Sequence, residues 1–180
     1  MMSDEYLEMC DDFANLISND KNISCDYVMD ILKKYSSTIS VFDMMEFSSQ
    51  VIEENKYVQE SYREDSQKSY VESFLFRVRD ISNDKNTYAK NIDKKAFMNA
   101  ITTFKTNYTN ENTKSKLIFS IASIYATFVL EEPIHPVGTP FPGSLKVEEN
   151  GGEFLCPVKD ANKDTPNAVC NICLAEQLDF

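Results

Sequence analysis

Apolar residues recur every three or four positions through the first 132 residues of the chain. In residues 68–82, for example, Phe74, Val78 and Ile81 follow this spacing, which places them on one face of an α-helix. The same period predicts helices in six segments, which are residues 4–19, 25–35, 40–63, 68–82, 93–108 and 113–129. We therefore expect an all-α fold, an irregular bundle of about six helices.

The segment 113–129 differs from the others because apolar residues surround more than half of its circumference. A helix that is apolar on most sides is buried, so this segment is predicted to be the central helix. Asp93 and Thr113 stand at the start of the last two predicted helices and are candidates for their N-caps.

Proline and glycine are confined to one end of the chain. All six prolines and all four glycines lie after residue 132. Because these residues break helices and mark tight turns, the chain changes character there. We expect residues 1–132 to form the helical bundle and residues 133–180 to form a Pro/Gly-rich segment packed on it, within the single domain that 180 residues allow.

This C-terminal segment, called the tail below, opens with HPVGTPFPG at residues 135–143. Its three prolines fix φ and remove backbone donors, which predicts a stiff, extended loop. Two short apolar runs around the turn ENGG then predict a small hairpin that ends near Cys156. A Thr-Pro pair suits the N-cap and first position of a short last helix over residues 166–178.

Three of the five cysteines lie in the tail. Cys170 and Cys173 form a Cys-x2-Cys pair, which supplies two ligands from one turn, and Cys156 and His135 are the natural third and fourth ligands. Thiolates and imidazoles that converge from separate short segments bind zinc or hold an iron–sulfur cluster. We therefore predict a metal site made of His135, Cys156, Cys170 and Cys173, with zinc as the metal and an iron–sulfur cluster as the alternative.

Other interpretations of these residues stay open, because their spacing matches no standard zinc-finger template. The cysteines also suit packing as small buried hydrophobes or a disulfide, and His135 suits a hydrogen-bonded loop. Four ligands would make a closed, structural zinc site, whereas three cysteines and a water, with His135 as acid or base, would make a catalytic one. A thiol redox pair at Cys170 and Cys173 is disfavoured because such a motif usually follows a strand in a βαβ unit.

The segments HPVGTPFPG and CPVKDANKDTPNAVCNICLAEQ resemble the C-terminal signature of a family of uncharacterised proteins from methanogenic archaea. The resemblance is most specific over residues 131–177 and is general in the helical part. It implies a methanogen cytoplasm, strongly reducing and rich in iron–sulfur chemistry, which favours the iron–sulfur alternative. It implies no particular activity.

Charge and composition narrow the classes of partner. With 29 acidic and 18 basic residues the formal net charge is −11, which disfavours nucleic-acid binding. The N-terminus lacks a secretory pattern, and the sequence has no apolar run of about 20 residues, so we expect no membrane anchor. An odd number of cysteines without an export signal indicates the cytoplasm. Residues 131–180, with nine acidic and three basic residues, suit a basic protein partner or a solvated surface.

Motifs of common enzymes, such as GxGxxG, GxxxxGK[ST], HExxH and GxSxG, are absent from the sequence. Arg77 lies near a buried stripe and is expected to form a structural ion pair, or else to bind an anionic ligand. The sequence thus predicts a binding or assembly protein shaped by zinc, with a metalloprotein or an iron–sulfur or thiol redox enzyme as the alternative. Whether the protein is an enzyme is left open.

Overall fold

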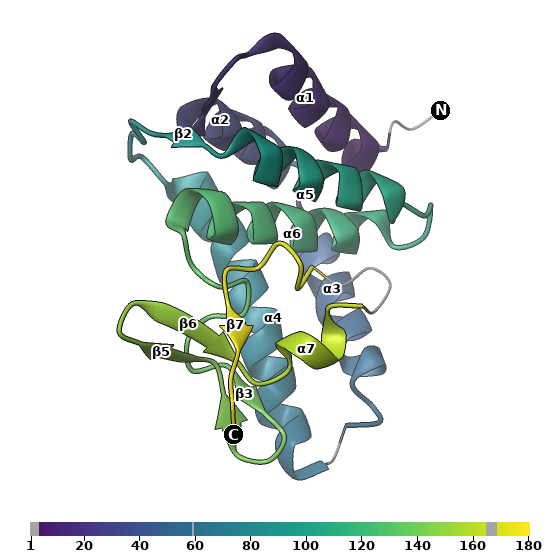
Figure 1. The fold of residues 1–180 in the computed structure, drawn as a ribbon. Coiled ribbons are helices and arrows are strands. Elements are labelled where there is room, and N and C mark those ends of the chain that lie inside the picture. The colour runs from purple at the N-terminus through teal and green to yellow at the C-terminus, as the bar shows by residue number, and fades with distance from the viewer. Residues whose placement is uncertain (1–3, 59, 165–168) are drawn as a thin grey trace.

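The computed structural model describes residues 4–58, 60–164 and 169–180, and most of the chain before residue 131 is helical, as the periodicity predicts (Figure 1). The helices of this part are α1 Glu5–Asn19, α2 Cys25–Ser36, α3 Val41–Glu54, α4 Glu60–Asn83, α5 Lys94–Thr106 and α6 Thr113–Ile124, which continues as the π-helix η1 Tyr125–Leu130. The prediction of a largely helical N-terminal part is confirmed.

One predicted helix, residues 40–63, is divided in two. α3 ends at Glu54, and a turn separates it from α4. In this turn the Arg63 guanidinium donates to the carbonyl oxygen of Val58 from Nε at 3.1 Å and from Nη2 at 2.8 Å. The prediction of one continuous helix was wrong: residues 60–63 belong to α4, and neither proline nor glycine marks the turn before them.

The predicted central helix is confirmed. α6 packs against α1, α2, α3 and α4 (Figure 1), and Leu117, Ile118, Ile121 and Ile124 are fully buried. The continuous helix Thr113–Leu130 is long and apolar enough to cross a bilayer, but 67% of it is buried inside the fold. Most of this helix is therefore covered by the rest of the fold.

One of the two predicted N-caps is confirmed. Asp93 precedes α5, and its Oδ1 accepts a hydrogen bond from the backbone N of Ala96 at 2.8 Å. The other prediction was wrong, since Thr113 is already the first residue of α6 and Asn112 occupies the cap position. Asn112 has a left-handed φ of 53°, a conformation that asparagine tolerates better than most residues.

Three small sheets accompany the helices within the described residues, so the expected all-α class is corrected to a mostly helical fold with short strands. β1 Ile23–Ser24 pairs antiparallel with β2 Asn91–Ile92 inside the helical part. These strands have two residues each, too few for the alternation that identifies a strand in a sequence. The strands of the tail are β3 Pro140–Phe141, β4 Leu145–Lys146, β5 Glu148–Asn150, β6 Glu153–Cys156 and β7 Glu176–Gln177.

The predicted hairpin is confirmed as the antiparallel pair β5 and β6, in which Glu149 lies opposite Phe154. Gly151 and Gly152 form its turn with φ of 62° and 87°. Both values lie in the left-handed region that glycine adopts without steric cost, which explains the GG pair. Cys156 is the last residue of β6, as the sequence predicts.

The predicted last helix, residues 166–178, was wrong for its described part, and residues 166–168 lie outside the described residues. From Val169 onward the chain forms turns and then β7, which pairs parallel with β6 (Figure 1). Leu178 N donates to Cys156 O at 2.9 Å. These backbone groups therefore bind another strand instead of forming helical bonds. A shorter helix, α7 Lys159–Asn162, lies before this segment.

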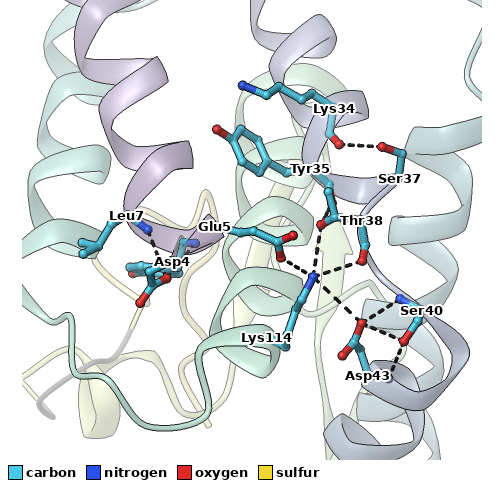
Figure 2. Close-up of polar contacts among 11 residues, drawn as sticks. Asp4, Glu5, Leu7, Lys34, Tyr35, Ser37, Thr38, Ser40, Asp43 and Lys114 are labelled. Carbon is cyan, nitrogen blue, oxygen red and sulfur yellow. Dashed lines mark hydrogen bonds and ion pairs between the residues drawn. The ribbon is translucent and has the colours of Figure 1, made fainter. Parts of the chain in front are cut away.

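A lysine joins three helices on the side of the bundle shown in Figure 2. The Lys114 amine of α6 forms an ion pair with Glu5 of α1, donates to Thr38 O at 3.0 Å, and lies 4.0 Å from Asp43 Oδ2 of α3. The same Asp43 oxygen accepts from Ser40 N at 2.7 Å, which completes the capping box of α3. The ion pair thus fixes the start of α1 and the start of α3 relative to α6.

We expect Lys114→Met to lower the free energy of unfolding by about 1–2 kcal/mol. The Lys114 and Glu5 side chains are each only 30% exposed, so the substitution would leave a partly desolvated carboxylate without its cation. Urea unfolding at neutral pH measures the loss. Lys95→Met replaces an exposed lysine of α5 and serves as the control; an equal effect of both substitutions would contradict the role of the Lys114 network.

Candidate functional site

His135 lies at the junction between the tail and α4. Its ring packs against two aromatic residues of α4, with centroid distances of 5.5 Å to Tyr70 and 6.0 Å to Phe74. Phe141 of β3 covers another side at 6.0 Å. The only histidine of the chain is therefore held among aromatic rings, because the proline-rich loop places it against the helical bundle.

Arg77 of α4 fixes the backbone on which His135 stands. This arginine is buried, with 5% of its surface exposed, and it donates to the carbonyl oxygens of Ile134 and, at 2.8 Å, of Pro133. Its carboxylate neighbour is Glu132, at 3.9 Å and half exposed. The expected ion pair is present, but the closer partners are two peptide carbonyls.

Burial, and then the positive charge of Arg77, lower the pKa of His135 to about 4. The imidazole is therefore neutral at pH 7, and one ring nitrogen carries a free lone pair. Within the described residues neither ring nitrogen forms a hydrogen bond. A neutral imidazole is the form that binds a metal ion.

Cys156 and Cys173 lie close together, next to the loop that carries His135. Cys156 is buried with Val147 and Ala175 in a small apolar cluster, and Cys173 packs against the same cluster. The Cys173 Sγ also accepts a hydrogen bond from the backbone N of Ile134 at 3.4 Å. The residue beside His135 is thus in direct contact with one of the predicted thiol ligands.

Cys170 lies in the same region, half-buried, on the turn that precedes β7. Burial first, and then the neighbouring thiols of Cys173 and Cys156, raise the pKa of Cys170, while the charge of Lys159 opposes the rise. Burial also raises the pKa of Cys156, and Cys173 adds to the effect. Cys170 thus lies within electrostatic range of the other two thiols.

The tail is arranged differently around these thiols than the sequence predicts. The turn that carries Cys170 and Cys173 is held by a bond from Cys173 N to Val169 O at 3.2 Å, and no helix presents the pair on one face. In residues 4–58, 60–164 and 169–180, no group of three or more His, Cys, Asp or Glu side chains has the geometry to hold a metal ion. The four predicted ligands share a region without converging on one point, so metal binding stays a prediction.

Sequence reasoning missed Lys159, which organises this region. Its Nζ donates to Cys173 O at 2.9 Å and to Ala175 O at 2.6 Å. The sequence held one signal of this role. Lys159 lies three residues after Cys156, just beyond the predicted hairpin, and this position brings its amine close to the thiols. Its carbonyl partners depend on the path of the tail, which no motif in the sequence encodes.

A family model described as an uncharacterised protein conserved in archaea, DUF2115, matches residues 25–178. The chain belongs to the DUF2115 family. Its match covers the helices from α2 onward and the tail with its cysteines and histidine. The resemblance of the tail to a family from methanogens is thereby confirmed and extends over most of the chain.

Relatives of this DUF2115 chain occur in several methanogens. Two UPF0305 proteins of Methanothermobacter thermautotrophicus are 34% and 32% identical to it, over 83% and 84% of this chain and 94% and 95% of their own lengths. A UPF0305 protein of Methanopyrus kandleri is 43% identical over a shorter stretch, 32% of this chain and 41% of its own. No solved structure matches the chain.

Proposed function

We propose that this DUF2115 protein binds a metal ion through Cys156, Cys170, Cys173 and His135, with zinc as the metal and an iron–sulfur cluster as the alternative. One observation supports this proposal most directly. The three thiols come from two separate segments of the tail into one region, and the loop that carries His135 donates a hydrogen bond to Cys173. Thiols and an imidazole from short, separate segments are the ligands that structural zinc sites use.

Metal binding would connect the segments of the tail that carry the four proposed ligands. Because burial raises the pKa of Cys156 and Cys170, these thiols are protonated at pH 7, and each would release its proton when it binds the metal. The ion would then connect β6, the turn before β7 and the His135 loop, which are joined in the described structure mainly by backbone hydrogen bonds.

A closed site with four protein ligands supports a structural role for the metal. We therefore place the protein among non-enzymatic binding or assembly proteins of the methanogen cytoplasm, in which the metal holds the acidic tail in one shape. Residues 131–180 have nine acidic and three basic residues, so the matching partner surface is a basic region of another protein. The alternative, an iron–sulfur or thiol redox enzyme, uses the same cysteines and differs in the metal.

Elemental analysis of protein purified without oxygen tests this function, together with its absorption spectrum. We expect about one zinc ion per chain, and its loss in Cys173→Ser. Iron with sulfide and a brown chromophore would support the iron–sulfur alternative. Replacing zinc by Co²⁺ adds a second readout, because thiolate-to-cobalt charge-transfer bands grow with the number of thiolate ligands.

A matched control separates ligand loss from the loss of any buried thiol. Cys25 is fully buried in the helical core and is not a proposed ligand, so Cys25→Ala should lose stability and keep the metal. His135→Gln should weaken metal retention by about tenfold or more while leaving the three thiolates in place. Wild-type protein without metal, or equal metal in Cys173→Ser and in wild type, would overturn the proposed site.

A further inference from the structure

A cavity of about 280 Å³ lies between the helices on the side of α4 that bears Tyr70. α1, α3, α4, α5 and α6 all contribute to its wall, and Val169 of the tail closes one edge. Five aromatic side chains line it, namely Tyr6, Phe47, Tyr70, Phe104 and Phe119. A mostly apolar cavity with a few polar groups is the usual form of a small-molecule site.

The aromatic walls are in contact with one another. Phe47 of α3 stacks on Tyr70 of α4 with a centroid distance of 6.5 Å, and Tyr70 lies 4.8 Å from Phe74 behind it. The faces of such rings carry partial negative charge. A ligand that enters this cavity therefore meets apolar surface that also favours a positive charge.

Glu54 places a formal negative charge at the same cavity. It is the last residue of α3, and it lines the cavity with an exposed side chain. The C-terminal end of a helix carries partial negative charge, and the last turn of α3 holds no basic residue. An acidic residue gains no stability from the helix at this position.

The neighbouring charges leave this carboxylate available. Glu53 pairs with Lys56, whereas Glu54 forms no ion pair within the part of the chain that the structure describes. Lys116 also lines the cavity, but its amine bonds to the hydroxyl and, at 3.3 Å, to the carbonyl of Thr109. Thr109 is neutral and does not line the cavity, so Lys116 keeps its positive charge, but its amine is held at a residue outside the cavity wall.

We infer that this cavity binds a small organic cation, an ammonium group attached to an apolar or aromatic body. The ammonium would lie between Glu54 and the faces of Phe47 and Tyr70, and the body would fill the aromatic interior. Gln50 and Asn107 add neutral hydrogen-bonding groups that would orient it. This site uses none of the four proposed metal ligands, although Tyr70 in its wall also packs against His135.

Three probes of nearly equal shape test the inference, namely 3-phenylpropylamine, 3-phenylpropan-1-ol and 3-phenylpropionate. Titration into the 15N-labelled full chain, followed by NMR, measures their affinities and their location. We expect the amine to bind about tenfold more tightly than the alcohol, with shifts at cavity residues, and the carboxylate to bind least. Glu54→Gln should lower the amine affinity by about tenfold and leave the alcohol affinity unchanged.

Glu53→Gln is the matched control, since it removes the adjacent charge on the same helix end from a residue that does not line the cavity. Tyr70→Leu keeps the cavity apolar and should weaken the amine more than the alcohol. Equal affinities for all three probes, preference for the carboxylate, equal effects of Glu54→Gln and Glu53→Gln, or no binding at millimolar concentrations would each overturn the inference.

Discussion

Arg77→Met is expected to lower the free energy of unfolding by about 3–5 kcal/mol, the largest stability loss among the substitutions considered for this protein. The arginine is buried, and its guanidinium donates to the carbonyl oxygens of Pro133 and Ile134. Methionine fills similar space and leaves both buried carbonyls without a donor. Each such group costs about 1–3 kcal/mol, more when its lost partner was charged.

The same substitution should loosen the start of the tail. Ile134 N donates to Cys173 Sγ, so release of this backbone would also move the His135 loop away from the thiols. Urea unfolding measures the first effect, and hydrogen exchange at residues 132–135 measures the second. Arg79→Met, two positions along α4 and 61% exposed, is the control. If both variants unfold within about 0.5 kcal/mol of each other, Arg77 does not anchor the tail.

The sequence predicted the helical part well where burial decides the structure. In α6 the apolar positions surround the helix, and Leu117 and Ile121 are accordingly fully buried. The break between α3 and α4 could not be predicted, because the turn has no proline or glycine and is held by Arg63 bonding to a carbonyl oxygen. A peptide carbonyl leaves no signature in a sequence, so such a partner appears only in the fold.

The structure of the tail could likewise be predicted only in part from the sequence. Gly151 and Gly152 predicted the hairpin because only glycine adopts their backbone angles without steric cost. The helix expected around Cys170 and Cys173 fails because β7 pairs with β6, a contact between segments twenty residues apart. Local propensity cannot register this pairing, since it depends on where the hairpin lies.

The surroundings of His135 were equally inaccessible from the sequence. The sequence singled out the residue by its chemistry, but Tyr70 and Phe74, which pack against it, belong to a helix more than sixty positions earlier. Periodicity assigned these two aromatics to the core and said nothing about the tail. Residue type could thus identify candidate ligands, whereas their distances depend on tertiary packing.

Asp84 illustrates a buried polar group that no pattern in the sequence identified. It follows α4 in a polar loop, yet only 8% of its surface is exposed. Its Oδ2 accepts from Tyr88 OH at 2.6 Å and from Tyr125 OH at 2.9 Å, and its Oδ1 accepts from Asn86 N at 2.8 Å. The carboxylate thereby joins the end of α4 to the π-helix η1, which carries Tyr125.

Burial opposes the ionisation of Asp84, but the hydrogen bonds from Tyr88, the Asn86 backbone and Tyr125 outweigh it and lower the pKa of the carboxyl. The unfolded chain binds this proton near pH 3.9, whereas the folded protein binds it only at lower pH. The stability that Asp84 contributes is therefore complete above about pH 4 and is lost as the pH falls through the lowered folded pKa.

Asp84→Ala is accordingly expected to lower the free energy of unfolding by about 2–4 kcal/mol at pH 7, because the buried Tyr125 hydroxyl, the half-buried Tyr88 hydroxyl and a backbone N–H lose their acceptor. The loss should shrink as the pH falls below about 4, because the unfolded wild-type chain then binds the proton and the folded protein binds it only at its lowered pKa. Urea unfolding of both proteins between pH 2.5 and 7 measures this difference. Asp80→Asn, on the exposed face of α4, should stay close to wild type at every pH. A loss that does not change between pH 7 and pH 2.5 would show that Asp84 stabilises the fold through packing, and that its charge does not hold η1 against α4.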